Sequence, residues 1–342
     1  MIDSDTPILA LDADSRSSQR RRFLQLAGTA TVALGLAACG GGNDDSSPTP
    51  TPTPSSSGSP TPTPSSTVAL DADYLNFALQ LQYLSAQYYL RATTGAGIEA
   101  LPVSTQLPEG GAALLKGTGT QGTVSGGAAV TFTDTLLGEY AREIAAGELA
   151  HVLFLRSAVG AAASAQPAID ISDAATGGFT RIARTAGLIG LADTFNPYAN
   201  EVNFLLGAFM LQDVLVTAYR GAIPALSSLL FVNAAADVLA TKSFHAAMIR
   251  AQLYARGLTV RTQTDQISAA RDSFDGSTDS DQGVTGSATA ANIVPADVDG
   301  IVFGRTPGQV LNVFYANNSA VSGGGFYPSG VTSTFFRTSA AN

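Results

Sequence analysis

The amino-acid sequence predicts an all-α fold: a bundle of four long helices with long connections and an irregular C-terminal extension. Four segments repeat apolar residues at spacings of three and four, which is the period of an amphipathic helix. Stretches rich in Gly, Ser and Thr separate these segments. The only two histidines of the 342-residue chain fall in the second and fourth segments. The same helices therefore carry polar groups from which a buried site could be built.

The bundle is expected over residues 69–257. Its four helices are expected at residues 71–92, 133–159, 199–220 and 227–256. Within each helix the apolar residues fall on one face, and that face is expected to meet the other three helices. Pro224 separates the third helix from the fourth because proline cannot continue a helix. Gly257 suits the left-handed conformation that ends one.

The connections inside the bundle are expected to be long. Residues 95–130 have no sustained helical period and predict a long loop or a small hairpin. Residues 161–198 predict a long connection with short helices, one of them near 179–191. The second and third helices are therefore not expected to be joined by a tight turn.

Regular patterning fades after the fourth helix. Residues 258–342 are rich in Ser and Thr and contain three consecutive glycines from Gly323. We expect this extension to be largely irregular, either wrapping the bundle or poorly ordered. Short helical or extended pieces are expected only near Ile267 and at residues 308–314.

Residues 1–39 have the anatomy of an export signal. Three arginines precede a short apolar stretch that ends at Cys39. About a dozen apolar residues are too few to cross a bilayer as a permanent helix. The Arg-Arg-x-Phe-Leu core resembles a twin-arginine signal, and Leu-Ala-Ala-Cys resembles the site at which bacterial lipoproteins are cleaved and acylated. Cys39 is therefore the expected lipidation site, and the alternative is an ordinary thiol within a signal peptide.

Residues 40–68 are expected to form a disordered tether. Their Pro, Thr and Ser content cannot bury apolar surface and favours an extended, solvated chain. No aspartate directly follows Cys39, since the next residue is Gly40, so we expect a lipid-anchored protein of the outer membrane that faces the periplasm. Cys39 is the only cysteine, which excludes an intramolecular disulfide. With 27 Asp and Glu against 18 Lys and Arg, nucleic acid is not an expected partner.

Two pairs of polar residues stand on the inner faces of the second and fourth helices. Glu148 and His151 are three positions apart, so both side chains project from one side of a helix. Lys242 and His245 repeat this spacing, but an ammonium stands where the first pair has a carboxylate. Because these residues lie among apolar positions, each is expected to have a buried partner.

Three segments carry a resemblance to a known family. They are Asn-Phe-Ala-Leu at 76–79, the segment 143–152 around Glu148, and Phe-Asn-Pro-Tyr at 195–198 with Asn-Phe-Leu-Leu at 203–206. From about residue 70 to 256 the sequence resembles the ferritin-like domain family of bacterial exported proteins, a group that includes plant desiccation-related proteins. The resemblance implies a ferritin-like four-helix bundle, in which two helices each give a Glu and two give Glu-x-x-His to a pair of metal ions.

The resemblance also places the family's six ligand positions on this chain. The family's residues are retained at Glu148, His151 and His245, and replaced at Gln82, Gln212 and Lys242. The replacements remove three negative charges and add one positive charge. Since one carboxylate and one ammonium already sum to zero, a divalent ion would leave about two uncompensated positive charges in the core.

Three interpretations of this polar core remain open. In the first, which we favour, no cofactor binds, and the Lys242 ammonium takes the place of the metals, paired with Glu148 and hydrogen-bonded by Gln82 or Gln212. In the second, Lys242 is displaced and Glu148 with the two histidines holds one iron, manganese or zinc ion. The third is a working di-metal oxidase.

The expected function follows from these interpretations. We expect a bacterial cell-envelope lipoprotein, attached to the membrane through Cys39, whose bundle has a structural or stress-related role and a degenerate di-metal site. The alternative is a metal-binding oxidoreductase or metal-storage protein. Whether the chain is an enzyme stays open at this point.

Overall fold

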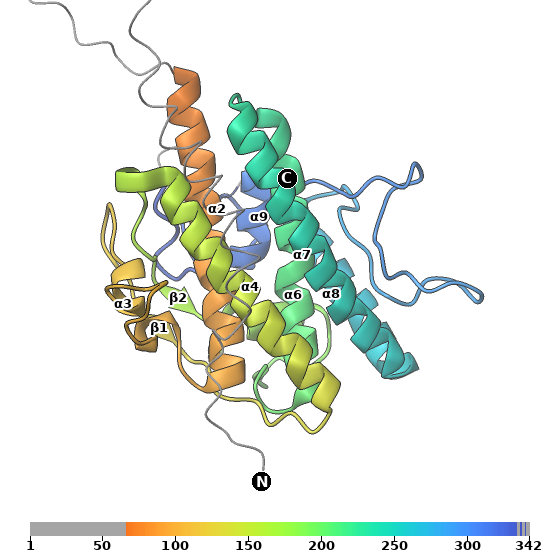
Figure 1. The fold of residues 1–342 in the computed structure, drawn as a ribbon. Helices are drawn as coiled ribbons and strands as arrows, with labels where there is room; N and C mark the ends of the chain where they lie inside the picture. The colour runs from red at the N-terminus through yellow and green to blue at the C-terminus, as the bar shows by residue number, and fades with distance from the viewer. Residues whose placement is uncertain (1–65, 334–335, 337–338, 340–342) are drawn as a thin grey trace, which may run out of the picture. The chain divides into compact units, whose positions relative to one another are not determined.

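The computed structural model describes residues 66–333, 336 and 339. The expected signal at 1–39, with Cys39, and nearly all of the expected tether lie outside the described residues. The four bundle helices are α2 (Ser66–Thr94), α4 (Thr135–Val159), α6 (Glu201–Ala222) and α7 (Leu229–Ala255), labelled in Figure 1. The all-α prediction is confirmed. Helix α2 begins at Ser66, so the last residues assigned to the tether are helical.

Shorter elements fill the connections and the C-terminal part. They are η1 (Ile98–Ala100), α3 (Gly111–Leu114), β1 (Val124–Ser125), η2 (Gly160–Ala162), β2 (Ile169–Asp170), α5 (Gly178–Thr185), η3 (Ile223–Ala225), α8 (Leu258–Asp275) and α9 (Pro307–Tyr315). Strand β1 pairs in parallel with β2, with Val124 opposite Ile169. Of the two alternatives for residues 95–130, the long loop agrees with the structure, whereas the small hairpin is wrong because β1 pairs with β2 outside this segment. The partner strand β2 lies in the second long connection. The sequence does not predict this pairing, because no local turn joins the two strands.

Side-chain caps set the starts of two bundle helices. The carboxylate of Asp134 accepts hydrogen bonds from the backbone N–H groups of Leu136 and Leu137 at 3.1 and 3.2 Å. The side chain of Asn200 accepts one from the backbone N–H of Asn203 at 2.9 Å. Each cap satisfies donors that have no partner in the first turn of a helix. The helices consequently begin one residue after these caps, at Thr135 and Glu201.

Helix α6 is the central helix of the bundle. Every residue from Phe204 to Tyr219 is buried, including polar Gln212 and Asp213, so this part of the helix has no side that faces solvent. By length and composition alone, α4 and α6 could each cross a membrane, but α6 with its following turn has 89% of its most apolar window buried inside the protein. Its hydrophobicity therefore fits a core helix of the bundle.

Helix α2 is also buried on nearly every side, although its sequence predicts a single apolar face. All ten residues from Leu81 to Leu90 are buried, polar Gln82, Ser85 and Gln87 among them. The C-terminal segment covers the side of α2 that faces away from the bundle. There, the side chain of Gln80 bonds to the backbone of Thr332, and the Tyr327 hydroxyl donates to the Gln80 carbonyl at 3.1 Å.

Helix α8 includes the short helical piece expected near Ile267 but is longer than the sequence predicts. This helix has 18 residues and follows α7 directly through Gly257, whose φ of 93° fits the expected left-handed conformation. Its buried face includes polar residues, such as Thr264 and Arg271, so the apolar period that marks a helix is weak. Helix α9 coincides with the short piece expected at 308–314.

A buried network of ion pairs joins α8 to the bundle. Three arginines and three aspartates, all at most 3% exposed, alternate within it: Arg250, Arg271, Arg305, Asp213, Asp275 and Asp281. The Arg250–Asp213 and Arg271–Asp281 pairs have N–O distances of 2.7 and 2.9 Å. The charges of these six side chains sum to zero, which makes their burial tolerable. This polar contact adds to the apolar one that α8 makes through Val260, Ile267 and Phe274.

Candidate functional site

The six positions singled out in the sequence meet at the centre of the bundle. Helix α2 supplies Gln82, α4 supplies Glu148 and His151, α6 supplies Gln212, and α7 supplies Lys242 and His245. Gln82, Glu148, Gln212 and Lys242 are 0% exposed, and His245 is 4% exposed. The helical spacing of three thus places each pair inside the bundle, as the sequence predicts.

Glu148 is the hub of this cluster. Its Oε2 atom accepts hydrogen bonds from the Lys242 ammonium and from the Gln82 amide. Its Oε1 atom accepts one from the Gln212 amide at 2.9 Å and one from His245 Nδ1 at 3.0 Å. A side chain from each of the other three bundle helices therefore donates to this single carboxylate.

The two glutamines act on Glu148 and not on Lys242. The sequence interpretation that an amide would hydrogen-bond the ammonium is corrected in this respect. The Nε2 atom of Gln82 also donates to the backbone carbonyl of Glu148 at 3.0 Å, which directs the amide N–H groups toward α4. The Oε1 atoms of Gln82 and Gln212 are buried and accept no hydrogen bond within the described part of the chain.

The two histidines differ in their surroundings. Since a carboxylate only accepts hydrogen bonds, His245 carries its proton on Nδ1 when it bonds to Glu148. His151 lies with its ring centre 6.2 Å from that of His245, and its Nδ1 atom is buried without a hydrogen-bond partner among the described residues. Burial lowers the pKa of His151 to about 3, so this imidazole is neutral at physiological pH.

Gly147 makes room for His245 against α4. A Cβ atom at this position would lie 2.8 Å from His245 Cε1 and 3.1 Å from Nε2. Any side chain here would displace the imidazole from Glu148. Gly147 could not be recognised from the sequence, because the spacing of residues within α4 does not indicate how closely a side chain of α7 approaches it.

The Lys242 ammonium keeps Glu148 ionised. Burial alone would raise the pKa of this carboxyl, but the Lys242 charge and the His245 hydrogen bond hold it well below its ordinary value of 4.5. Burial lowers the pKa of Lys242 in turn, against the attraction of Glu148. We take the pair as charged, because all four donors on Glu148 favour its anionic form.

The charge of Glu148 affects the pKa of two tyrosine side chains. Burial first, and Glu148 second, raise the pKa of both Tyr89 and Tyr219. Both phenols therefore stay protonated. These phenols and the neutral His151 thus add no charge to the Glu148–Lys242 pair.

Comparison with known proteins identifies the fold family. A model of the ferritin-like domain family matches residues 70–255, more than half of the chain. The chain belongs to the ferritin-like domain family. Its ferritin-like domain coincides with the bundle of α2, α4, α6 and α7.

Two relatives match about three quarters of the chain. The ferritin-like catalase Nec2 of Nesocodon mauritianus is 27% identical over 275 residues, which cover 76% of this chain and 83% of the relative. The desiccation-related protein PCC13-62 of Craterostigma plantagineum is 28% identical over 277 residues, which cover 77% and 83%. No solved structure was found to match the chain. The resemblance to desiccation-related proteins is thereby confirmed.

The donor set of this ferritin-like domain does not fit a di-metal centre. Such centres use four carboxylates, and this cluster has one, whose two oxygens are already occupied by four donors. Lys242 has no lone pair to offer a cation while it is charged. Within the described residues, no three His, Cys, Asp or Glu side chains are placed so that they could hold one metal ion.

Proposed function

We propose that this chain is an exported, lipid-anchored ferritin-like protein whose bundle is closed by a buried ion pair in place of two metal ions. Its role would be structural or protective, as the name of the desiccation-related relative suggests. The observation that carries the proposal is the Lys242 ammonium on Glu148, at a position where a metal-binding member would have a carboxylate.

The charge balance of the cluster supports a metal-free bundle. Glu148 and Lys242 neutralise each other, so a dication entering between them would add two uncompensated charges to a region that solvent does not reach. A buried uncompensated charge costs several kcal/mol or more. The Lys242 ammonium is part of the chain and is held next to Glu148 in the folded protein. A free cation would have to displace it to bind this carboxylate.

Metal analysis of the full chain tests this proposal. The protein would be purified from the cell envelope, and its transition-metal content measured by mass spectrometry against protein concentration. The matched control is the triple variant Gln82→Glu, Gln212→Glu, Lys242→Glu, which restores four carboxylates. We expect far less than one equivalent in the natural chain and metal uptake in the variant. One or two equivalents in the natural chain would overturn the proposal.

A metal-dependent oxidoreductase is the second candidate function. It is favoured by the buried Nδ1 atom of His151, which lacks a partner among the described residues, and by the name of the ferritin-like catalase relative. Lys242 would have to leave Glu148 for the two histidines and the carboxylate to hold one iron, manganese or zinc ion. One equivalent of metal that is lost in His151→Ala, together with metal-dependent peroxide consumption, would favour this candidate.

The lipid anchor is a separate part of the proposal. We expect Cys39 to be acylated and to hold the protein at the outer membrane, facing the periplasm. The test is fractionation of cells that produce the natural chain or Cys39→Ala. Release of Cys39→Ala into the soluble periplasmic fraction is expected, whereas retention of the variant in the membrane would contradict a lipid anchor at this residue.

A further inference from the structure

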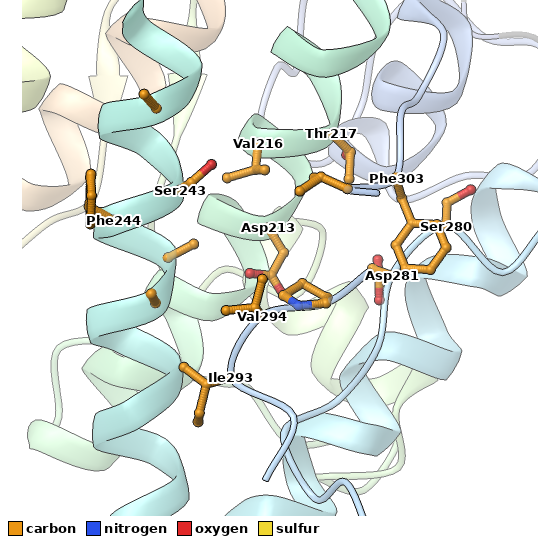
Figure 2. A pocket seen from close by; sticks show the side chains of 15 residues that line it. Asp213, Val216, Thr217, Ser243, Phe244, Ser280, Asp281, Ile293, Val294 and Phe303 are labelled. Atoms are coloured by element: carbon orange, nitrogen blue, oxygen red, sulfur yellow. The ribbon is translucent and has the colours of Figure 1, made fainter. Parts of the chain in front are cut away.

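A cavity of about 310 Å³ lies beside the bundle, apart from the central cluster. Its walls come from α6, α7 and the C-terminal segment between α8 and α9, and Figure 2 shows side chains from all three. None of its lining residues belongs to the cluster around Glu148. Asp213 follows Gln212 on α6 but points about 100° further round the helix, into the cavity. The cavity is therefore a separate feature of the molecule.

The walls of the cavity are almost entirely hydrocarbon. Val216 on α6 and the side chains of Val294 and Phe303 in the C-terminal segment line it, as Figure 2 shows. Ala247 on α7 is also part of the lining. At the mouth, Phe244 is 73% exposed and Val294 is 67% exposed. Large apolar side chains at this exposure lose the favourable free energy of burial unless a ligand covers them.

One polar atom inside the cavity has room for a partner. Oδ2 of Asp213 accepts from Arg250 at 2.7 Å and lies 3.6 Å from Arg271, but no described residue donates to Oδ1. The Asp213 residue is only 3% exposed. The hydroxyls of Ser243 and Thr217, by contrast, already donate to backbone carbonyls at 2.9 Å. The cavity wall thus presents a carboxylate oxygen, Oδ1 of Asp213, that is free to accept a hydrogen bond from a ligand.

The charges around Asp213 favour an uncharged ligand. Arg250 and Arg271 already neutralise this carboxylate within the buried network. A cationic ligand would add an uncompensated charge, and an anionic one would meet Asp213 and Asp281 on the cavity wall. A neutral donor such as a hydroxyl can bond to Oδ1 without either cost.

The wall formed by the C-terminal segment is fixed in place by Arg250. Its guanidinium donates to the backbone carbonyls of Gln282, Gly283, Asn292 and Ile293 at 2.6 to 3.0 Å. These bonds close a loop of this segment against α7. The cavity is therefore preformed, as ligand sites usually are.

We propose that this cavity binds a small, uncharged, largely apolar alcohol whose hydroxyl donates to Asp213 Oδ1. Its volume of about 310 Å³ is roughly twice the ~150 Å³ of a cavity that holds benzene, which sets the ligand at about twelve non-hydrogen atoms. The apolar body fills the space between α7 and the C-terminal segment, and Phe244 and Val294 cover its outer end.

Binding of 2-naphthalenemethanol to the full chain tests the proposal. The chain would carry Cys39→Ala, so that no detergent is needed that could compete for an apolar cavity, and binding would be followed by calorimetry. We expect saturable one-to-one binding in the micromolar range. Loss of the hydroxyl in 2-methylnaphthalene should weaken binding at least about tenfold, since hydrogen bonds to charged groups are strong. The anion 2-naphthoate should bind at least about tenfold more weakly as well.

Substitutions on α7 locate the site. Ala247→Phe fills the cavity and should weaken binding of 2-naphthalenemethanol more than about tenfold. Ala240→Phe narrows it at an exposed position where folding is not at risk, and should also weaken binding. Ala236→Phe makes the same change at an exposed position outside the lining and should leave binding within about twofold.

Four results would overturn the proposal. They are no saturable binding by the parent chain, equal binding by Ala240→Phe and Ala236→Phe, equal binding of 2-methylnaphthalene, and equal or tighter binding of 2-naphthoate. The comparison of the three compounds does not depend on any variant being folded. The proposal is independent of the metal content of the central cluster.

Discussion

Lys242 on α7 donates a hydrogen bond to Glu148 on α4 at a point in the bundle where both side chains are 0% exposed. A buried pair of this kind adds little net stability, because the cost of removing two charges from water offsets their attraction. Removing one partner is different, since the other charge is then buried alone. The pair consequently makes the bundle sensitive to single substitutions at either position.

Lys242→Met should destabilise the protein by about 3–5 kcal/mol near neutral pH. Lys242→Glu should destabilise it more in metal-free buffer, because it adds a second carboxylate. The double variant Glu148→Gln with Lys242→Met should recover much of the loss, since no charge is left unpaired. Urea unfolding followed by circular dichroism gives the free energies. Equal stability of the natural chain and Lys242→Met would contradict a buried pair.

The stability of Lys242→Met should change with pH in the opposite direction from that of the natural chain. In the natural chain the pKa of Glu148 is depressed, so its contribution is present above the ordinary value of 4.5 and is lost as pH falls through the folded pKa. Without Lys242, burial raises that pKa, and the cost grows as pH rises through 4.5. The stability difference between the two proteins should shrink as pH falls toward 4.

Gly147→Ala should destabilise the bundle by about 1–3 kcal/mol, because the added Cβ overlaps the His245 ring. In a His245→Ala background the same substitution should instead stabilise α4 by up to about 1 kcal/mol, since alanine favours a helix over glycine. Thermal and urea unfolding of the four proteins in this cycle give the coupling. Additive effects would show that Gly147 does not serve to admit His245.

Asp272→Asn should stabilise the protein above neutral pH. Burial, and then the negative charge of Asp281, raise the pKa of Asp272 to about 7 from 3.8. Between these values the unfolded carboxyl ionises while the folded one stays protonated, so the natural chain loses stability as pH rises. With solvent screening at this half-buried position, the gain should be about 1–2 kcal/mol at pH 8 and near zero at pH 3. Asp237→Asn, at an exposed position on α7 that does not affect the pKa of Asp272, is the control.

Arg250→Met should cost about 3–5 kcal/mol, because it leaves Asp213 with a weaker partner and releases four backbone carbonyls. Hydrogen exchange should rise in residues 282–293. Arg256→Met is the matched control: Arg256 pairs with half-exposed Asp134 at 3.2 Å, and its loss should cost no more than about 1 kcal/mol. Unchanged exchange in 282–293 would show that Arg250 does not hold the cavity wall.

The four bundle helices could be predicted from sequence because each carries an apolar face with a period of three and four residues. The full length of α8, beyond the short piece expected near Ile267, could not, since Arg271 and Asp275 on its buried face are balanced by aspartate and arginine side chains from other parts of the chain. The pairing of β1 with β2 was missed for a similar reason. Both features depend on contacts between segments with no shared local pattern.

The residues of the central cluster could be predicted from sequence, but not all of the hydrogen bonds between them. The spacing of Glu148 with His151, and of Lys242 with His245, places these side chains inside the bundle whatever their chemistry. The Gln82 and Gln212 amides donate to Glu148 because of how their side chains are rotated. The spacing of residues along a helix does not determine this rotation. The need for a glycine at 147 depends in turn on how closely α7 approaches α4.

The enclosure of α2 by the C-terminal segment has a consequence for how the molecule is made. Gln80 and Thr332 bond across 252 positions of sequence, and Asp73 bonds to Ser333 across 260. Contacts of such high sequence separation form late, because the loop between them must close first. Among the described helices, α2 is thus one of the last to be fully enclosed, because residues 327–333 must be synthesised and must reach it before its outer side is covered.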